Sequence, residues 1–343
     1  MKKGLLYTTL FLAAGAFLLL SAPSCGNKKG GQMNPINDTL STLRNLDLLI
    51  GEDPDNPENY FARAQYHFDA GNPASAIVDC QKAIRLDSTK AKYYLLLGDL
   101  NMMVRKPDET RVCLEKALEL EPENTEALLK FGELQLYLKD YEQMFSYVNR
   151  ALKKEPYNSK GYFLKGLAYA EMRDTNTAIT SLQTCVEIDP EYFNAYMLLG
   201  TIFSDRNNPL AATYFQNAIQ TNPGKGEAYY GLAYYYQMNN QPEAAIATYR
   251  NMLRVSSQNP AAMHNIGYIY LFDLNMKDSA ISWFNDAIRA DVRYADAIYH
   301  RGYAYELKGD KTAARMDYEA ALRVKEDHEM AEKGLNRVGR SKN

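Results

Sequence analysis

A small residue recurs at a nearly constant interval along most of this chain, and this recurrence is the strongest constraint on its fold. The first column of small residues has steps of 33 to 35 and comprises Ala64, Gly98, Gly132, Gly166, Gly200, Ala233, Gly267 and Gly302. A second column keeps the same step and comprises Ala83, Ala117, Ala151, Cys185, Ala218, Met252, Ala287 and Ala321. Self-similarity at a fixed period predicts stacked structural repeats, whose core grows by addition of units.

Each repeat has the pattern of two helices joined by a short turn. In the fourth unit, Tyr162, Gly166 and Tyr169 follow helical spacing, and a second helical pattern begins after the turn. Prolines that cannot continue a helix follow the second segments at Pro122, Pro156, Pro190 and Pro223. The small columns allow two antiparallel helices to cross closely. The sequence therefore predicts an all-α array of eight helical hairpins over residues 57–327.

The repeat pattern is similar to that of the tetratricopeptide repeat family, most clearly in AIYHRGYAYELKGD of residues 297–310. The resemblance covers residues 57–327 and implies a right-handed α-solenoid of about eight hairpins. Two units depart from the pattern, with Asn101 at a large position and Thr110 and Met144 at small positions, so their helices are expected to cross more loosely. We expect one further helix within residues 38–56 and a C-terminal capping helix within residues 328–343.

The first 24 residues have the composition of a targeting signal. Two lysines precede an apolar run over residues 4–20, and small residues lead to Cys25. This segment resembles a bacterial lipoprotein signal, which implies that Cys25 becomes the lipidated first residue of the mature protein. The position three before the cysteine is Ala22, where that family usually has leucine, so an uncleaved anchor and an ordinary secreted protein remain alternatives. Residues 25–37 are glycine-rich and polar and are predicted to form a flexible tether.

The lipoprotein resemblance implies a location in a Gram-negative cell envelope. Gly26 is not the aspartate that often retains lipoproteins at the inner membrane, so we expect the outer membrane and its periplasmic side. The acyl chains on Cys25 would anchor the chain firmly, because several chains on one residue satisfy the two-signal requirement for stable anchoring.

Charge and motif content argue against nucleic-acid binding and catalysis. The net charge is −3 and no basic run exceeds two residues, whereas nucleic acid requires a basic surface. The sequence contains neither a Gly-rich phosphate loop nor metal-ligand spacing among its four histidines and its cysteines. We therefore expect no catalytic residue, metal, cofactor or small-molecule substrate. Cys80, Cys113 and Cys185 are interpreted as small buried apolar residues.

The family resemblance implies a binding surface in the concave groove, which the first helices line. By register, the groove positions include Phe61, Phe68, Leu95, Phe163, Leu167, Tyr230, Tyr234, His264, Tyr268, Tyr299 and Tyr303. Tyrosines on successive helices can hold an extended peptide or a helix, because tyrosine offers a rigid apolar ring and a hydroxyl. The alternative is that these tyrosines pack on one another. A terminal-carboxylate clamp by Lys92, Lys130 and Lys160 is a further, less favoured alternative.

The sequence thus predicts a membrane-tethered scaffold or adaptor that binds another envelope protein or a peptide through its concave groove. Two other roles remain open at this point. The chain could be a structural subunit of an envelope secretion, gliding or outer-membrane assembly complex. It could also be a non-catalytic regulator of a cell-wall hydrolase or protease.

Overall fold

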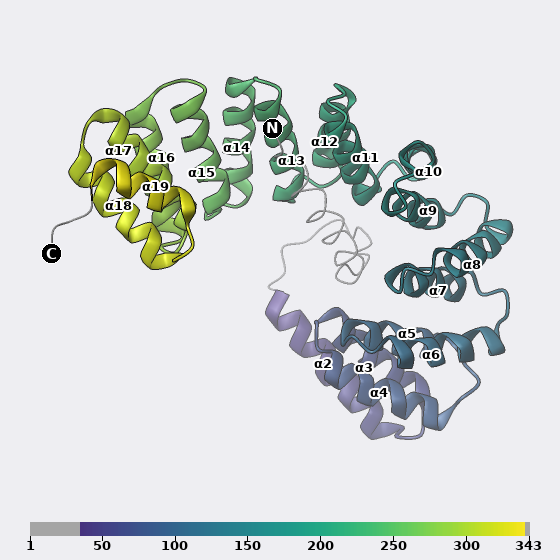
Figure 1. Cartoon of the computed structure of the whole chain (residues 1–343). Helices are drawn as coiled ribbons and strands as arrows, with labels where there is room; N and C mark the ends of the chain where they lie inside the picture. The colour runs from purple at the N-terminus through teal and green to yellow at the C-terminus, as the bar shows by residue number, and fades with distance from the viewer. Residues whose placement is uncertain (1–34, 340–343) are drawn as a thin grey trace. The chain divides into compact units, whose positions relative to one another are not determined.

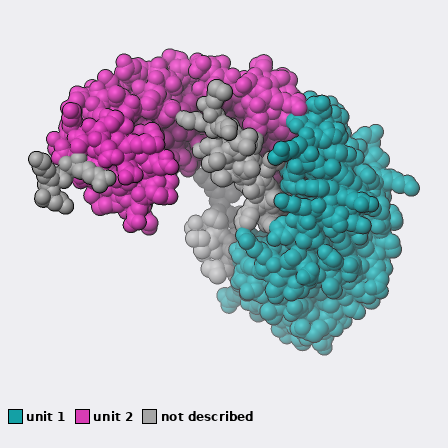
Figure 2. Space-filling model, viewed as in Figure 1, with its two compact units in different colours: residues 1–189 teal, residues 190–343 magenta. Residues whose placement is uncertain are grey.

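The computed structural model describes residues 35–339, and all regular secondary structure in that range is helical (Figure 1). The chain divides into two compact units, residues 1–189 and 190–343, which are described separately (Figure 2). The targeting signal, Cys25 and the tether up to residue 34 lie outside the described residues. Within residues 35–339, no helix combines the length and apolar character needed to cross a membrane.

In the described part of unit 1, residues 35–189, one single helix is followed by four hairpins. The single helix is α2 (Pro35–Glu52), which begins three residues before the position expected from the sequence, with proline in its first turn. The hairpins are α3 (Pro57–Asp69) with α4 (Pro73–Leu86), α5 (Ala91–Met103) with α6 (Pro107–Leu120), α7 (Thr125–Tyr137) with α8 (Tyr141–Lys154), and α9 (Ser159–Glu171) with α10 (Thr175–Ile188).

Over residues 190–339, unit 2 has four hairpins followed by one single helix. The hairpins are α11 (Phe193–Asp205) with α12 (Leu210–Thr221), α13 (Gly226–Met238) with α14 (Pro242–Val255), α15 (Pro260–Phe272) with α16 (Lys277–Ala290), and α17 (Ala295–Lys308) with α18 (Lys311–Val324). The last helix is α19 (Glu329–Val338). The predicted fold class, an all-α array of helical hairpins with a C-terminal capping helix, is confirmed.

A left-handed residue in the turn of every hairpin reverses the chain direction. These residues are Gly71, Arg105, Lys139, Arg173, Asn207, Asn240, Asn275 and Gly309, with φ between 51° and 87°. The turn after α9 is representative: the amide of Arg173 donates to the carbonyl of Ala170 at 3.1 Å, and that of Asp174 donates to Tyr169 at 2.9 Å. This pair of bonds closes the end of the first helix and directs the chain into the second.

The small columns mark the closest approach of the two helices in a hairpin. A Cβ built on Gly166 would lie 2.6 Å from Cγ of Leu182, and one on Gly132 would lie 2.6 Å from Cγ2 of Val148. At Gly98 the nearest atom is 3.5 Å away, which confirms the looser crossing expected in the second unit. The same expectation is wrong for the third unit, because the unbranched side chain of Met144 is fully buried without separating the helices.

The C-terminal end of unit 2 is closed by α19, which packs on α18. Ala331, Gly334 and Leu335 are buried against α18, and a Cβ on Gly334 would lie 2.5 Å from Cζ of Tyr318. The opposite side of α19 exposes Lys333 and Asn336 to solvent, together with acidic residues. The apolar side of such a helix covers the last hairpin, and its polar side faces solvent.

Candidate functional site

The eleven predicted groove residues lie on first helices, but they differ in how much surface they offer. Half-buried side chains among them are Phe61, Phe68, Tyr230, Tyr234, Tyr268 and Tyr303. Buried side chains among them are Leu95, Phe163, Leu167, His264 and Tyr299. The buried group packs within the array: the Tyr299 ring, for example, lies 5.8 Å from that of Tyr318 on α18. Contact surface for a partner therefore comes from the half-buried group.

In unit 1 the first helices are joined by ion pairs. Each lysine near the predicted groove reaches a carboxylate on the preceding first helix. The Nζ–oxygen distances are 2.7 Å for Lys92–Glu58, 2.7 Å for Lys130–Asp99 and 2.9 Å for Lys160–Glu133. Because carboxylates of the chain itself already compensate these three charges, the arrangement disfavours the carboxylate clamp.

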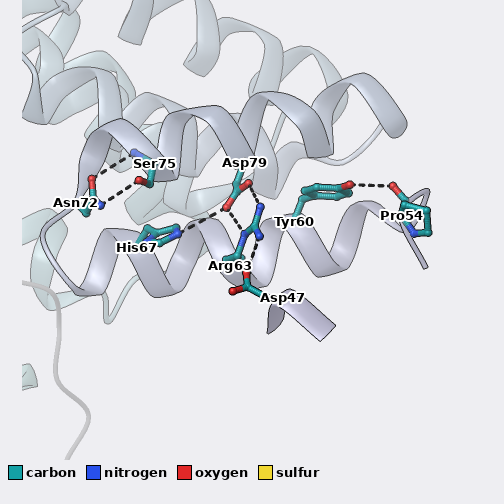
Figure 3. Close-up of polar contacts among 8 residues, drawn as sticks. All are labelled: Asp47, Pro54, Tyr60, Arg63, His67, Asn72, Ser75 and Asp79. Atoms are coloured by element: carbon teal, nitrogen blue, oxygen red, sulfur yellow. Dashed lines mark hydrogen bonds and ion pairs between the residues drawn. The ribbon is translucent and has the colours of Figure 1, made fainter. Parts of the chain in front are cut away.

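A partly buried arginine–aspartate pair holds the two helices of the first hairpin together (Figure 3). Nε and one terminal nitrogen of Arg63 donate to the two carboxylate oxygens of Asp79, each at 2.7 Å. The other terminal nitrogen donates to Asp47 of α2 at 2.7 Å. The hydrogen bond from Arg63 to Asp79 is the main cause that raises the pKa of the guanidinium. The pair is fully engaged within the fold and is structural.

In unit 2 three aromatic side chains gather on neighbouring first helices. Tyr268 and Phe272, one helical turn apart on α15, have ring centroids 4.4 Å apart, and Phe272 stacks on Tyr303 of α17 at 5.9 Å. The side chain of Phe272 remains 43% exposed. We call these three residues the aromatic cluster. Phe272 was not among the predicted groove residues, although its position four residues after Tyr268 places it on the same side of the helix.

Two histidines form a neutral pair beneath the aromatic cluster. Nε2 of His264 lies 3.0 Å from Nδ1 of His300, and that Nδ1 lies 2.8 Å from the carbonyl oxygen of Asp296. A carbonyl oxygen only accepts, so Nδ1 of His300 carries the proton and Nε2 of His264 accepts. Burial lowers the pKa of both rings, that of His300 to about 3. The pair is therefore uncharged at neutral pH and supports the cluster from below.

The remaining candidate chemical groups are buried or scattered. Cys80, Cys113 and Cys185 are free thiols inside the hairpins, and burial raises their pKa values to about 12, 11 and 12. A thiol with so high a pKa is a poor nucleophile, because the thiolate is the reactive form. Among residues 35–339, no group of three His, Cys, Asp or Glu side chains could hold a metal ion.

Two tetratricopeptide repeat models match the chain. One matches residues 57–90, 159–192, 260–291 and 295–328, which correspond to the first, fourth, seventh and eighth hairpins. The other matches residues 214–247 and runs from α12 into α14. The second and third hairpins, which carry Asn101, Thr110 and Met144, fall outside the matched segments.

Solved structures resemble the chain only at the level of a shared architecture. The APC/C hetero-tetramer Cut9–Hcn1 has 17% identity and a TM-score of 0.49, and the match covers 86% of this chain and 58% of that one. YrrB, described as a TPR protein with an unusual peptide-binding site, has 19% identity and a TM-score of 0.46, covering 55% and 97%. MamA has 23% identity and a TM-score of 0.44, covering 47% and 94%.

A search of curated proteins gives no match. The assignment therefore rests on the repeat models and on the hairpins themselves. Tetratricopeptide arrays are in general scaffolds for protein interaction and not catalysts. The recurring hairpins and the five matched segments show that this chain contains tetratricopeptide repeats.

Proposed function

We propose that this chain is a non-catalytic scaffold that binds a protein or peptide partner through the aromatic cluster of unit 2. The observation that carries the proposal is the exposed ring of Phe272, held between Tyr268 and Tyr303 on neighbouring first helices. Exposed aromatic side chains that are fixed by their neighbours provide contact area at a small cost in conformational entropy.

The chemistry around the cluster favours an apolar or aromatic segment of the partner. The sequence of α15 contains no lysine, arginine, aspartate or glutamate. The histidine pair beneath the cluster is neutral, so it adds no charge to the surface. Arg337, whose guanidinium lies 5.8 Å from the centroid of the Tyr303 ring, is a cation beside the cluster, and it is paired with Glu306. The Tyr268 and Phe272 part of the surface therefore gains most from burying apolar area and little from ion pairs.

The proposal can be tested by affinity purification with quantitative mass spectrometry. The substitution Phe272→Asp, and separately the triple variant Tyr268→Ala, Phe272→Ala and Tyr303→Ala, should lower recovery of the principal partner at least about fivefold, the size expected for loss of an interface anchor. The matched control replaces three exposed side chains away from the cluster, Val78, Val112 and Tyr157, by alanine. Equal recovery with Phe272→Asp, in protein with native circular dichroism, would refute this role of the cluster.

The proposal also includes attachment to a membrane of the cell envelope through Cys25. The support is the resemblance of the first 25 residues to a lipoprotein signal. Substitution Cys25→Ser should move the protein from the membrane fraction to the soluble fraction, because the acyl chains would be lost. Continued retention in the membrane fraction would indicate an uncleaved N-terminal anchor.

A further inference from the structure

Helix α2 occupies the place of a second helix in the repeat, as side-chain contacts show. In three hairpins a cationic side chain of the first helix reaches a polar side chain sixteen residues earlier, on the helix before it. The contacts are Arg63–Asp47 at 2.7 Å, Lys165–Asn149 at 3.3 Å and Arg301–Asn285 at 2.7 Å. Asn149 and Asn285 belong to the second helices α8 and α16, and Asp47 takes the equivalent place on α2.

The turn after α2 also follows the repeat. The hydroxyl of Tyr60 donates to the carbonyl of Pro54 at 3.0 Å, six residues earlier. The hydroxyl of Tyr94, one repeat later, donates to the carbonyl of Ser88 at 3.2 Å, again six residues earlier. The contact made by Asp47 and the hydrogen bond in the turn after α2 therefore both follow the repeat. By this comparison α2 is the second helix of a hairpin that precedes the first complete one.

The first helix of that preceding hairpin is not supplied by the sequence at the expected register. One repeat before α3 the register falls on residues 23–35, which read PSCGNKKGGQMNP. Three glycines and two prolines replace the apolar helical pattern found in each first helix. The described residues therefore provide no first helix for the side of α2 that would pack on one.

The exposure of Leu49 shows that this side of α2 is open. Leu49 stands at the second small column and is 46% exposed, whereas every equivalent side chain in the eight hairpins is at most 5% exposed. The equivalents are Ala83, Ala117, Ala151, Cys185, Ala218, Met252, Ala287 and Ala321. Leu46, one turn earlier, is only half-buried, whereas its equivalents Leu114 and Leu182 are almost fully buried.

We propose that the open side of α2 is a docking site for one amphipathic helix of a partner protein, which completes this hairpin. The eight complete hairpins specify the chemistry of the missing helix, because each pairs a second helix with an apolar first helix that has a small residue at the crossing. Leu46 stands at the register of Leu114 and Leu182, which cross Gly98 and Gly166. The partner helix therefore carries glycine or alanine in the middle of its apolar side.

The large side chain of Leu49 fits such a complex. In the sixth hairpin the same column holds Met252, and its Cε lies 3.4 Å from the Cβ position of Gly226 at the start of α13. A large residue on the second helix is therefore accommodated when the first helix begins with a small residue. We expect a second small residue near the N-terminus of the docked helix.

The exposed side of α19 does not match α2, so the partner helix comes from a different protein and not from the end of a second copy. By register α19 is a first helix without a second one, and it places Asn336 where the complete first helices have glycine or alanine. Its exposed side carries Glu329, Glu332 and Lys333. Burial of these charges against Leu46 and Leu49 would be unfavourable.

The test uses a peptide with the sequence of α9, residues 159–171, whose Gly166 crosses a leucine at the register of Leu46. The peptide is held helical by a staple on its polar side, labelled, and titrated with the full-length protein under fluorescence anisotropy. We expect saturable binding, weakened about tenfold or more by Leu49→Asp. The matched substitution Val112→Asp, at an exposed site on the outer side of α6, should leave the affinity unchanged. A peptide with Gly166→Leu should not bind.

Two results would overturn the proposal. One is the absence of saturable binding at peptide concentrations up to about 1 mM, or equal affinity for the wild type and Leu49→Asp, with circular dichroism showing a folded variant. The other is a dimer of the protein alone in light scattering that Leu49→Asp dissociates, which would assign this side of α2 to a second copy. Leu49 is exposed, so its substitution should not unfold the chain.

Discussion

Arg301 lies against Asp317 with two parallel hydrogen bonds of 2.8 and 2.6 Å, from Nε and one terminal nitrogen to the two carboxylate oxygens. The same pairing joins Arg63 to Asp79 seven repeats earlier, so the first and the last hairpin are tied in the same way. In both, the arginine is on the first helix and the aspartate is buried on the second. The remaining terminal nitrogen reaches the helix before the hairpin.

Removal of one member of the Arg301–Asp317 pair should destabilise unit 2. Substitution Asp317→Ala leaves a partly buried guanidinium without its carboxylate and should cost about 2–3 kcal/mol, below the range for fully buried pairs because Arg301 remains partly exposed. Urea unfolding followed by circular dichroism measures the change. The double variant Arg301→Met with Asp317→Leu should lose less than Asp317→Ala, and a larger loss in the double variant would contradict this account.

Turn residues with positive φ allow a second prediction. Arg173 has φ of 64°, which costs a residue with a Cβ roughly 1 kcal/mol relative to glycine. Substitution Arg173→Gly should therefore stabilise unit 1 by up to about 0.6 kcal/mol, after the larger entropy of glycine in the unfolded chain is subtracted. The reverse change Gly71→Ala, at φ of 70°, should destabilise it by a similar amount. If both variants shifted the midpoint of urea unfolding in the same direction, the explanation would be wrong.

The space beside the glycine at the helix crossing differs between hairpins, and this difference gives a third prediction. Substitution Gly166→Ala should cost about 1–3 kcal/mol, because the new Cβ would lie 2.6 Å from Cγ of Leu182. Substitution Gly98→Ala meets its nearest neighbour at 3.5 Å and should be neutral or stabilising by up to about 1 kcal/mol through helix propensity. Thermal and urea unfolding of both variants tests the comparison, and equal losses would contradict the difference in crossing distance.

The neutral histidine pair makes the stability of unit 2 depend on pH. Burial lowers the pKa of His300 to about 3, below its unfolded value of about 6.5, so the unfolded state binds more protons between these pH values. The free energy of unfolding should therefore fall as the pH drops from about 6.5 toward 3, by at most about 1.4 kcal/mol per pH unit for this group. Above pH 7 the effect should be absent.

Comparison with a variant isolates the contribution of His300. Substitution His300→Phe keeps an aromatic ring beneath the aromatic cluster, but this ring does not titrate. Urea unfolding at pH 7 and at pH 4.5 should show a smaller loss of stability on acidification in this variant than in the wild type. An identical loss in both proteins would assign the pH dependence to other groups.

The sequence predicted the hairpins because the packing rule repeats eight times, so Gly166 and Ala151 could be placed by their register alone. The sequence predicted the exposure of individual side chains less well. His264 and Tyr299 were expected to line a groove, yet neighbouring helices bury them, since register gives the direction of a side chain but not what covers it. Phe272 was missed because it is the last residue of α15, outside the register positions that were compared.

The place of α2 was recognised from the sequence only as an additional helix. Its apolar residues follow helical spacing. The sequence does not show, however, that Asp47 contacts Arg63 as Asn285 contacts Arg301. That equivalence needs the side-chain contacts, because the small residue of the second column is replaced by Leu49 in α2.

The two ends of the array differ in polarity, because the outer side of α19 is polar. Head-to-tail contacts between identical molecules propagate into filaments unless one of the two ends is closed. With Lys333 and Asn336 facing solvent, the C-terminal end does not accept another hairpin, while Leu46 and Leu49 leave the N-terminal end apolar. Repeat stacking is therefore favoured at the N-terminal end only, where the proposed docking adds one partner helix to each chain.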